Sequence, residues 1–153
     1  METLNSYYSR AVSDLLYAEA GMEIGKKVND FNNVAALCAQ SAEKFLKSII
    51  ESGFPSDDDC IRLLKTHNLR SLYNKIITKF ELTVSSKDCK WLGDFYFDAR
   101  YPGDNFVVVN EDDALECLNI VKDVQSDTDK ILAQIQEERD SEKNTLKQLK
   151  FFE

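Results

Sequence analysis

Apolar residues recur every three or four positions along most of this sequence, which is the period of an amphipathic α-helix. The clearest stripes predict helices over about residues 4–28 and 31–52, with Asp30 as the N-cap of the second. A third stripe predicts a long last helix that begins at Asn110 as its cap and carries acidic residues in its first turn. Both ends of the chain are therefore expected to be helical.

The middle of the chain shows shorter helical stripes that turn residues interrupt. Helices are expected over about residues 60–64, 66–80 and 86–99. The Pro-Gly pair at 102–103 ends the last of these, because proline cannot continue a helix and also restricts the residue before it. Residues 106–109 are apolar, but a single strand would have no partner, so a packed loop is expected there.

The composition agrees with an all-α fold. The 153 residues include five glycines and two prolines, the two residues that helices tolerate least. A chain of this length fits one domain whose core needs neither disulfides nor metal. The predicted fold is an antiparallel up-and-down bundle of about five helices. The bundle is expected to span residues 1–140, and residues 141–153 are interpreted as a charged extension of the last helix or, less favoured, as a tail that docks on a partner.

Charge and cysteine usage narrow the function classes. A net charge of −8 repels the phosphate backbone, so broad nucleic-acid binding is not expected. No apolar run approaches the length of a membrane-spanning helix, and the first residues lack signal-peptide character. A cytoplasmic location without membrane contact is therefore predicted. The four cysteines form no CxxC pair, so half-buried free thiols are expected and a zinc site is not.

No catalytic set is complete in this sequence. It contains one histidine, His67, and lacks a nucleophile turn, a glycine-rich phosphate loop and a Glu-x-x-His pair for a di-iron centre. No catalytic residue, metal or cofactor is therefore assigned. One polar segment of interest covers residues 65–69. Either Thr66 merely caps a helix while His67 faces a neighbouring helix, or His67 lies in a polar pocket as a hydrogen-bonding or acid–base group.

The second segment of interest runs from Asp98 to Gly103. An arginine near a helix C-terminus is favoured by the helix dipole alone, and Pro-Gly is a common stop signal. Alternatively, Arg100 directs its guanidinium toward a phosphate or carboxylate, and Tyr101 offers a face for stacking. Both interpretations are open at the level of the sequence.

Several pieces of the chain, in this order, resemble the HEPN (higher eukaryotes and prokaryotes nucleotide-binding) domain family. The resemblance covers roughly residues 5–135 and includes a second helix close to the family's Gln-x-Ala-Glu-Lys-x-Leu-Lys pattern. The matching pieces are residues 14–18, residues 39–47, Thr66-His67-Asn68-Leu69, Ala99-Arg100-Tyr101-Pro102 and an acidic-start helix with Ala114.

The resemblance implies a helical up-and-down bundle that forms a homodimer in the cytoplasm of a prokaryote. It also implies a minimal nucleotidyltransferase as a partner, in a toxin–antitoxin-like pair. One branch of the family consists of metal-independent ribonucleases, which carry a histidine about four to six residues after the arginine. No histidine follows Arg100 in this chain. The resemblance therefore favours the other, non-catalytic branch, which binds a nucleotide or a partner protein.

The expected ligand site follows from that branch. Arg100 would contact phosphate, and Tyr101 would stack on the ligand or close the pocket. The full set of predicted ligand-binding residues is Arg100, Tyr101, His67, Lys44, Lys47 and Asp98. Two alternatives stay open, namely a divergent ribonuclease that uses His67 and a purely structural protein-interaction module.

Overall fold

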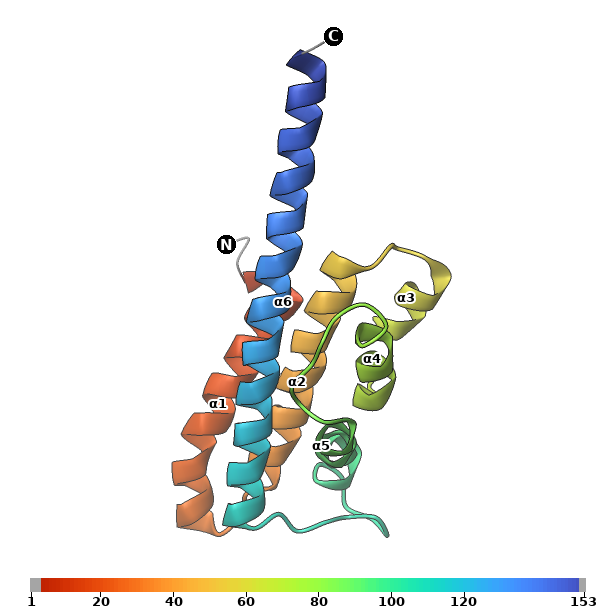
Figure 1. The fold of residues 1–153 in the computed structure, drawn as a ribbon. Helices are drawn as coiled ribbons and strands as arrows, with labels where there is room; N and C mark the ends of the chain where they lie inside the picture. The colour runs from red at the N-terminus through yellow and green to blue at the C-terminus, as the bar shows by residue number, and fades with distance from the viewer. Residues whose placement is uncertain (1–3, 152–153) are drawn as a thin grey trace.

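A computed structural model describes residues 4–151, and these residues form six α-helices joined by loops (Figure 1). The described chain contains no β-strand, so the all-α prediction is confirmed. The helices are α1 (Tyr7–Val28), α2 (Asn32–Gly53), α3 (Asp58–Leu63), α4 (Leu69–Ile76), α5 (Ser86–Asp98) and α6 (Glu111–Phe151).

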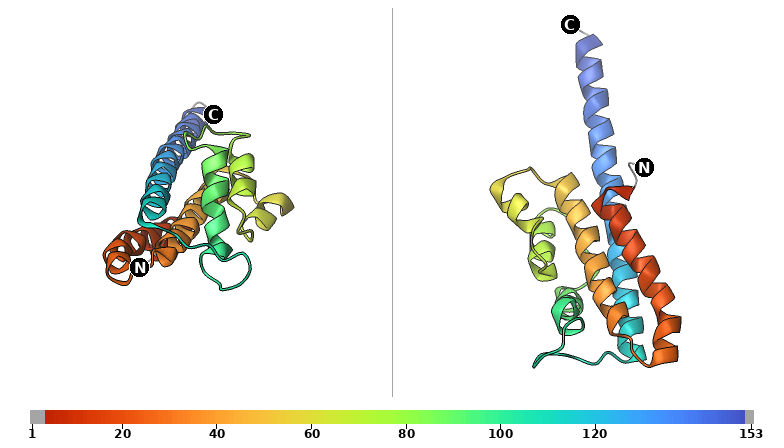
Figure 2. Two further views of the ribbon diagram at one scale, coloured as in Figure 1. Left: turned by 90° about the horizontal axis from the view of Figure 1, so that it is seen from below. Right: turned by 180° about the vertical axis from the view of Figure 1, so that it is seen from behind.

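The three long helices define the architecture. α1 runs down in Figure 1 and α2 returns beside it, while the short helices α3, α4 and α5 lead the chain down again before α6 rises. One leg of the up-and-down bundle is thus divided into short pieces. The two further views show α1 and α6 on one side of α2 and the short helices on its other side (Figure 2).

α2 is the central helix, as its wide apolar stripe predicts. Phe45, Leu46 and Ile49 are completely buried along it. Small residues let α1 approach closely, since Ala11 is also fully buried and its carbonyl oxygen accepts a hydrogen bond of 2.7 Å from the hydroxyl of Ser41. Burial of the α2 stripe on both sides supplies the main hydrophobic stabilisation of the fold.

One of the two predicted caps of the long helices is confirmed. Asn110 accepts a hydrogen bond from the backbone of Asp113 at 2.8 Å, so its predicted cap is confirmed. The prediction for α2 is wrong, because the helix begins at Asn32 and its N-cap is Phe31, which makes no side-chain cap bond. The carboxylate of Asp30 accepts from the backbone of Asn32 at 3.0 Å from outside the cap position. α1 begins at Tyr7 rather than near residue 4, because the hydroxyl of Ser6 is its N-cap.

The α4 region corrects the sequence prediction. A helix was expected over residues 66–80 with Thr66 as its cap, but α4 covers only Leu69–Ile76. The side chain of Asn68 is the cap and accepts from the backbone of Ser71 at 3.1 Å, while Thr66 accepts from the backbone of Asn68 in the preceding turn. Both residue types cap helices well, so the sequence did not discriminate between them.

The connector before α5 is fixed to α6 by one buried carboxylate. Asp127 accepts two hydrogen bonds from the backbone and hydroxyl of Thr83 at 2.9 and 2.7 Å, and a third from the backbone of Val84 at 3.1 Å. Asp127 is only 3% exposed, so these three donors compensate for the loss of water around its charge.

The four thiols are free and fully buried rather than half-buried as predicted. Burial raises the pKa of Cys38 and of Cys89 to about 12, and it also raises the pKa of Cys60 and Cys117. These groups are therefore neutral packing residues near pH 7.

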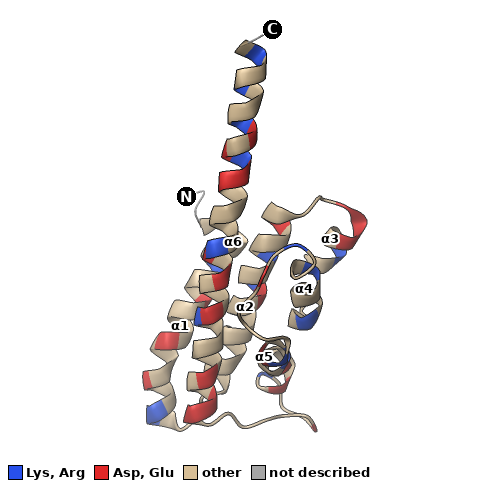
Figure 3. Ribbon diagram, viewed as in Figure 1, with Lys and Arg blue, Asp and Glu red and all other residues tan. Residues whose placement is uncertain are grey.

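α6 continues well past the bundle. Ile135 is its last buried residue, and every residue from Gln136 to Phe151 is exposed. The guanidinium of Arg139 still donates to the carbonyl oxygen of Ser52 at the end of α2, at 2.7 Å. Beyond that contact the helix projects alone (Figures 1 and 3). No helix within residues 4–151 has the length and apolar character needed to cross a bilayer.

Candidate functional site

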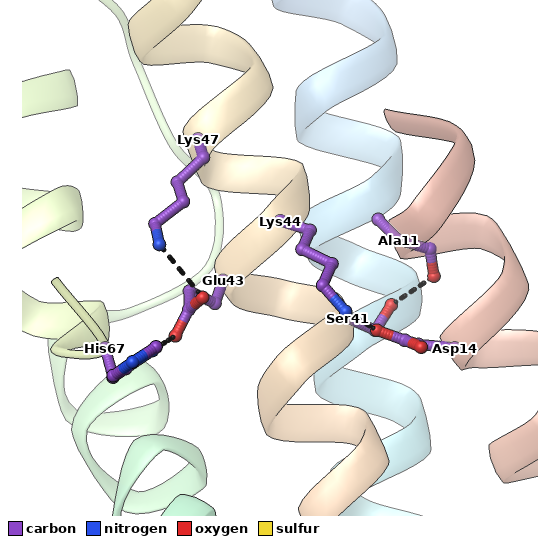
Figure 4. A network of polar contacts seen from close by, with 7 residues as sticks. All are labelled: Ala11, Asp14, Ser41, Glu43, Lys44, Lys47 and His67. Atoms are coloured by element: carbon purple, nitrogen blue, oxygen red, sulfur yellow. Dashed lines mark hydrogen bonds and ion pairs between the residues drawn. The ribbon is translucent and has the colours of Figure 1, made fainter. Parts of the chain in front are cut away.

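The site is built around Glu43, a carboxylate buried on the face of α2 that looks toward the short helices (Figure 4). Its side chain is 7% exposed, and that of Lys47, one turn later, is 5% exposed. The Lys47 ammonium lies 3.0 Å from Oε2 of Glu43. Each charge of this buried ion pair depends on the other, because removing one would leave the other buried without a counter-charge.

The second carboxylate oxygen of Glu43 forms a hydrogen bond with His67. Oε1 lies 2.9 Å from Nδ1 of His67, which sits in the turn before α4. The imidazole is about half exposed, with 48% of its side chain accessible. An ionised carboxylate only accepts hydrogen bonds, so Nδ1–H donates to Oε1, and Nε2 of a neutral ring is then the hydrogen-bond acceptor for a ligand.

The ring of Tyr96 on α5 contacts both His67 and Arg100. The Tyr96 ring stacks on His67 with the centroids 4.5 Å apart and the planes inclined by 15°. The guanidinium carbon of Arg100 lies over the same Tyr96 ring, 5.0 Å from its centroid, and 5.3 Å from the ring of Tyr101. These separations are within cation–π range. The two segments singled out in the sequence therefore meet at one edge of the bundle.

An open cleft of about 560 Å³ lies between α4 and α5 beside this stack. Such a volume is typical of small-molecule sites. Its wall combines bases and acids with the aromatic ring of Phe97. The lining residues are Thr66, His67, Asn68, Leu69, Arg70, Cys89, Lys90, Gly93, Asp94, Phe97 and Asp98.

Comparison with known families gives a clear assignment. The model of the HEPN domain family matches residues 4–131, which is most of the chain and includes both segments of the site. The chain belongs to the HEPN domain family. Neither a curated protein nor a solved structure gives a match.

The predicted ligand residues take different places in this HEPN domain. His67 and Asp98 line the cleft. Arg100 and Tyr101 do not line it; the guanidinium of Arg100 lies over the ring of Tyr96 and close to that of Tyr101.

The two predicted lysines also differ. Lys47 lies behind His67 as the buried partner of Glu43. Lys44 points away from the cleft and pairs with Asp14 on α1 (Figure 4). Consecutive helical residues are rotated by about 100°, so Lys44 cannot share the face that Glu43 occupies. The structure thus brings Lys47 to the group but not Lys44.

Three residues of the site were not identified from the sequence. Glu43 appeared only as part of a family pattern, although a Glu-Lys pair four residues apart on a mostly apolar stripe is a usable signal. Tyr96 was not singled out, because it lies within the stretch that predicts α5 and carries no separate signal. Nothing in the sequence marks Asn32 as a site residue, because its hydrogen-bond partners are backbone groups far away along the chain.

Asn32 fixes the loop between α5 and α6, which contains Arg100. Its side-chain amide donates to the carbonyl oxygens of Ala99 at 3.1 Å and Val107 at 2.8 Å, and its oxygen accepts from the backbone of Val109 at 2.9 Å. Both ends of the loop that follows α5 are therefore tied to the start of α2. The loop turns at Gly103, whose φ of +149° is a conformation that side chains disfavour.

Metal chemistry finds no support in the described residues. Within residues 4–151, no three side chains of His, Cys, Asp or Glu type lie close enough together to hold a metal ion. The candidate site offers a histidine fixed by a carboxylate, an exposed guanidinium and several aromatic faces.

Proposed function

We propose that this HEPN domain binds a nucleotide at the cleft between α4 and α5, without catalysing a reaction on it. One observation carries the proposal. His67, which lines the cleft, stacks on the ring of Tyr96, and the guanidinium of Arg100 lies over the same ring, so a cationic group stands close to the cleft.

The chemistry of this surface suits a nucleotide. The exposed guanidinium of Arg100 can form two parallel hydrogen bonds with a phosphate, and Lys90 in the cleft adds a second positive charge. Phe97 and Tyr101 are each more than half exposed and offer faces for a base to stack on. The carboxylate of Asp98 in the cleft is an acceptor suited to sugar hydroxyls.

The non-enzymatic assignment rests on the order of residues. The histidine of this chain precedes Arg100 instead of following it, so the family's ribonuclease motif is incomplete. The other partners that the resemblance implies, a second copy and a minimal nucleotidyltransferase in a toxin–antitoxin-like pair, remain predictions. Pull-down with the protein encoded next to this one would test the nucleotidyltransferase.

Calorimetric titration with ATP tests nucleotide binding directly. Arg100→Ala should weaken the affinity by about tenfold or more, because a hydrogen bond to a charged group contributes about 1.5–3 kcal/mol. Arg10→Ala is the matched control, since Arg10 is also an exposed arginine but lies on α1. Absence of ATP binding by the unaltered protein, or equal affinity in both variants, would refute the proposal. A purely structural module predicts the first of these results.

A metal-independent ribonuclease is the second candidate, and the contact between Glu43 and His67 favours it. A carboxylate that orients Nδ1 is the usual support of an acid–base histidine. RNA cleavage in the presence of a chelator should then vanish in His67→Ala. Cleavage that persists in this variant would come from a contaminating nuclease and would reject the candidate.

A further inference from the structure

Gly93 lies in the middle of α5, where a glycine lowers the stability of the helix. Glycine in a helix interior is less favourable than alanine, because its backbone loses more conformational freedom on folding. α5 runs from Ser86 to Asp98, so Gly93 is well inside both ends. A glycine at such a position needs a reason, either in packing or in function.

Packing explains the other glycines that lie in helices. A Cβ atom added at Gly25 would lie 2.5 Å from the ring of Phe31, and one added at Gly53 would lie 2.9 Å from the ring of Phe80. A Cβ atom added at Gly21 would lie 3.1 Å from a side chain of α2, which is also a tight contact. At these three positions a neighbouring side chain occupies the space that a Cβ atom would need.

Packing does not explain Gly93. A Cβ atom added there would meet Leu69 at 3.4 Å, and its next two contacts, at 3.5 and 3.6 Å, are with Leu69 as well. These distances are ordinary van der Waals contacts, and the backbone of Gly93 does not adopt a positive φ. Alanine would therefore fit between α4 and α5 and would make α5 more stable.

Gly93 lines the cleft and lies at the centre of the wall that α5 contributes. The lining residues of α5 form three successive pairs along the helix, namely Cys89 with Lys90, Gly93 with Asp94, and Phe97 with Asp98. Lys90, Gly93 and Phe97 are spaced by three and four residues, so they lie on one face of α5. A ligand that contacts both Lys90 and Phe97, about 10 Å apart along the helix axis, has to pass over Gly93.

We propose that Gly93 is a specificity-determining residue of the cleft, where the missing side chain lets a nucleobase lie against the backbone of α5 beside Phe97. This inference rests on the proposed function and assigns a place to one part of the ligand. Leu69, the nearest neighbour of Gly93 across the cleft, is 2% exposed, so the space there is apolar. A flat base suits that space, whereas a phosphate would lose its water there without gaining a hydrogen-bond donor.

Calorimetric titration of the full chain with ATP, combined with thermal unfolding, tests the inference. Gly93→Ala should weaken ATP binding by about fivefold or more, since the added methyl group has to fit between the base and the helix. The same variant should raise the Tm by about 1–4 °C, because alanine stabilises the helix. Gly93→Met should weaken binding further, because its flexible side chain can turn away from Leu69 into the cleft.

Gly53→Ala is the matched control, because its Cβ atom would crowd Phe80 and it does not line the cleft. It should lower the Tm and leave the ATP affinity of the folded protein unchanged. A lower Tm in Gly93→Ala would overturn the inference, because Gly93 would then have a packing role. Unchanged ATP affinity in Gly93→Ala would also overturn it, and a loss of affinity in Arg100→Ala would then still support the proposed function. Absence of ATP binding by the unaltered chain would refute both.

Discussion

Asn32→Ala is expected to destabilise the fold, because Asn32 fixes the loop between α5 and α6 that contains Arg100. The substitution removes two hydrogen bonds to the carbonyl oxygens of Ala99 and Val107 and one from the backbone of Val109. Asn32 is 7% exposed, so water does not readily replace these bonds. At a net value of about 1 kcal/mol for each bond, the free energy of unfolding should fall by about 2–4 kcal/mol. That is a large part of the roughly 5–15 kcal/mol that stabilises a typical domain.

Urea unfolding followed by far-UV circular dichroism measures this loss as a shift of the midpoint. Asn33→Ala is the control, because Asn33 is the next residue of the same helix and is exposed, and its change should stay within about 0.5 kcal/mol. Asn32→Asp should cost at least as much as Asn32→Ala, because it turns an amide donor into an oxygen that faces two carbonyl groups. A loss within about 1 kcal/mol of the Asn33→Ala control would show that the three bonds do not hold the loop.

Three further results are expected. Asp127→Ala should lower the free energy of unfolding by about 2–4 kcal/mol in the same assay, because three donors of the connector before α5 lose their acceptor. Glu43→Gln should cost about 3–5 kcal/mol, since it leaves the buried ammonium of Lys47 without its counter-charge, and an unchanged midpoint would contradict this. Cys38 and Cys89 should resist thiol reagents at pH 7 until the chain unfolds. Because burial raises the pKa of both thiols to about 12, their contribution to stability is present below the unfolded pKa near 9 and is lost as the pH rises toward 12.

The long helices could be predicted from the sequence because each carries an uninterrupted apolar stripe. The stripes of α1, α2 and α6 extend over many turns, so an error of one or two residues at an end did not change the fold. The short helices were less predictable. α4 is half the expected length, because short helices depend on packing that a local pattern does not contain.

The candidate site was only partly accessible to sequence reasoning. The histidine and arginine segments stood out by their residue types, and the structure brings them together through Tyr96. Lys44 was grouped with them because it belongs to the same family pattern, but a pattern along the chain does not say which helical face a residue occupies. Their role in ligand binding stays a prediction until nucleotide titration tests it.

Both halves of the site depend on α2, which connects the stability of the fold to the geometry of the cleft. Asn32 at the start of the helix ties down the loop with Arg100, and Glu43 three turns later fixes His67. The two contacts lie on one rigid helix, so the separation between arginine and histidine is set by the helix and not by the loops. A substitution at either position should therefore disturb the site even though neither side chain lines the cleft. Nucleotide affinity that stayed unchanged in a folded Asn32→Ala variant would mean that Arg100 does not need the loop to be held.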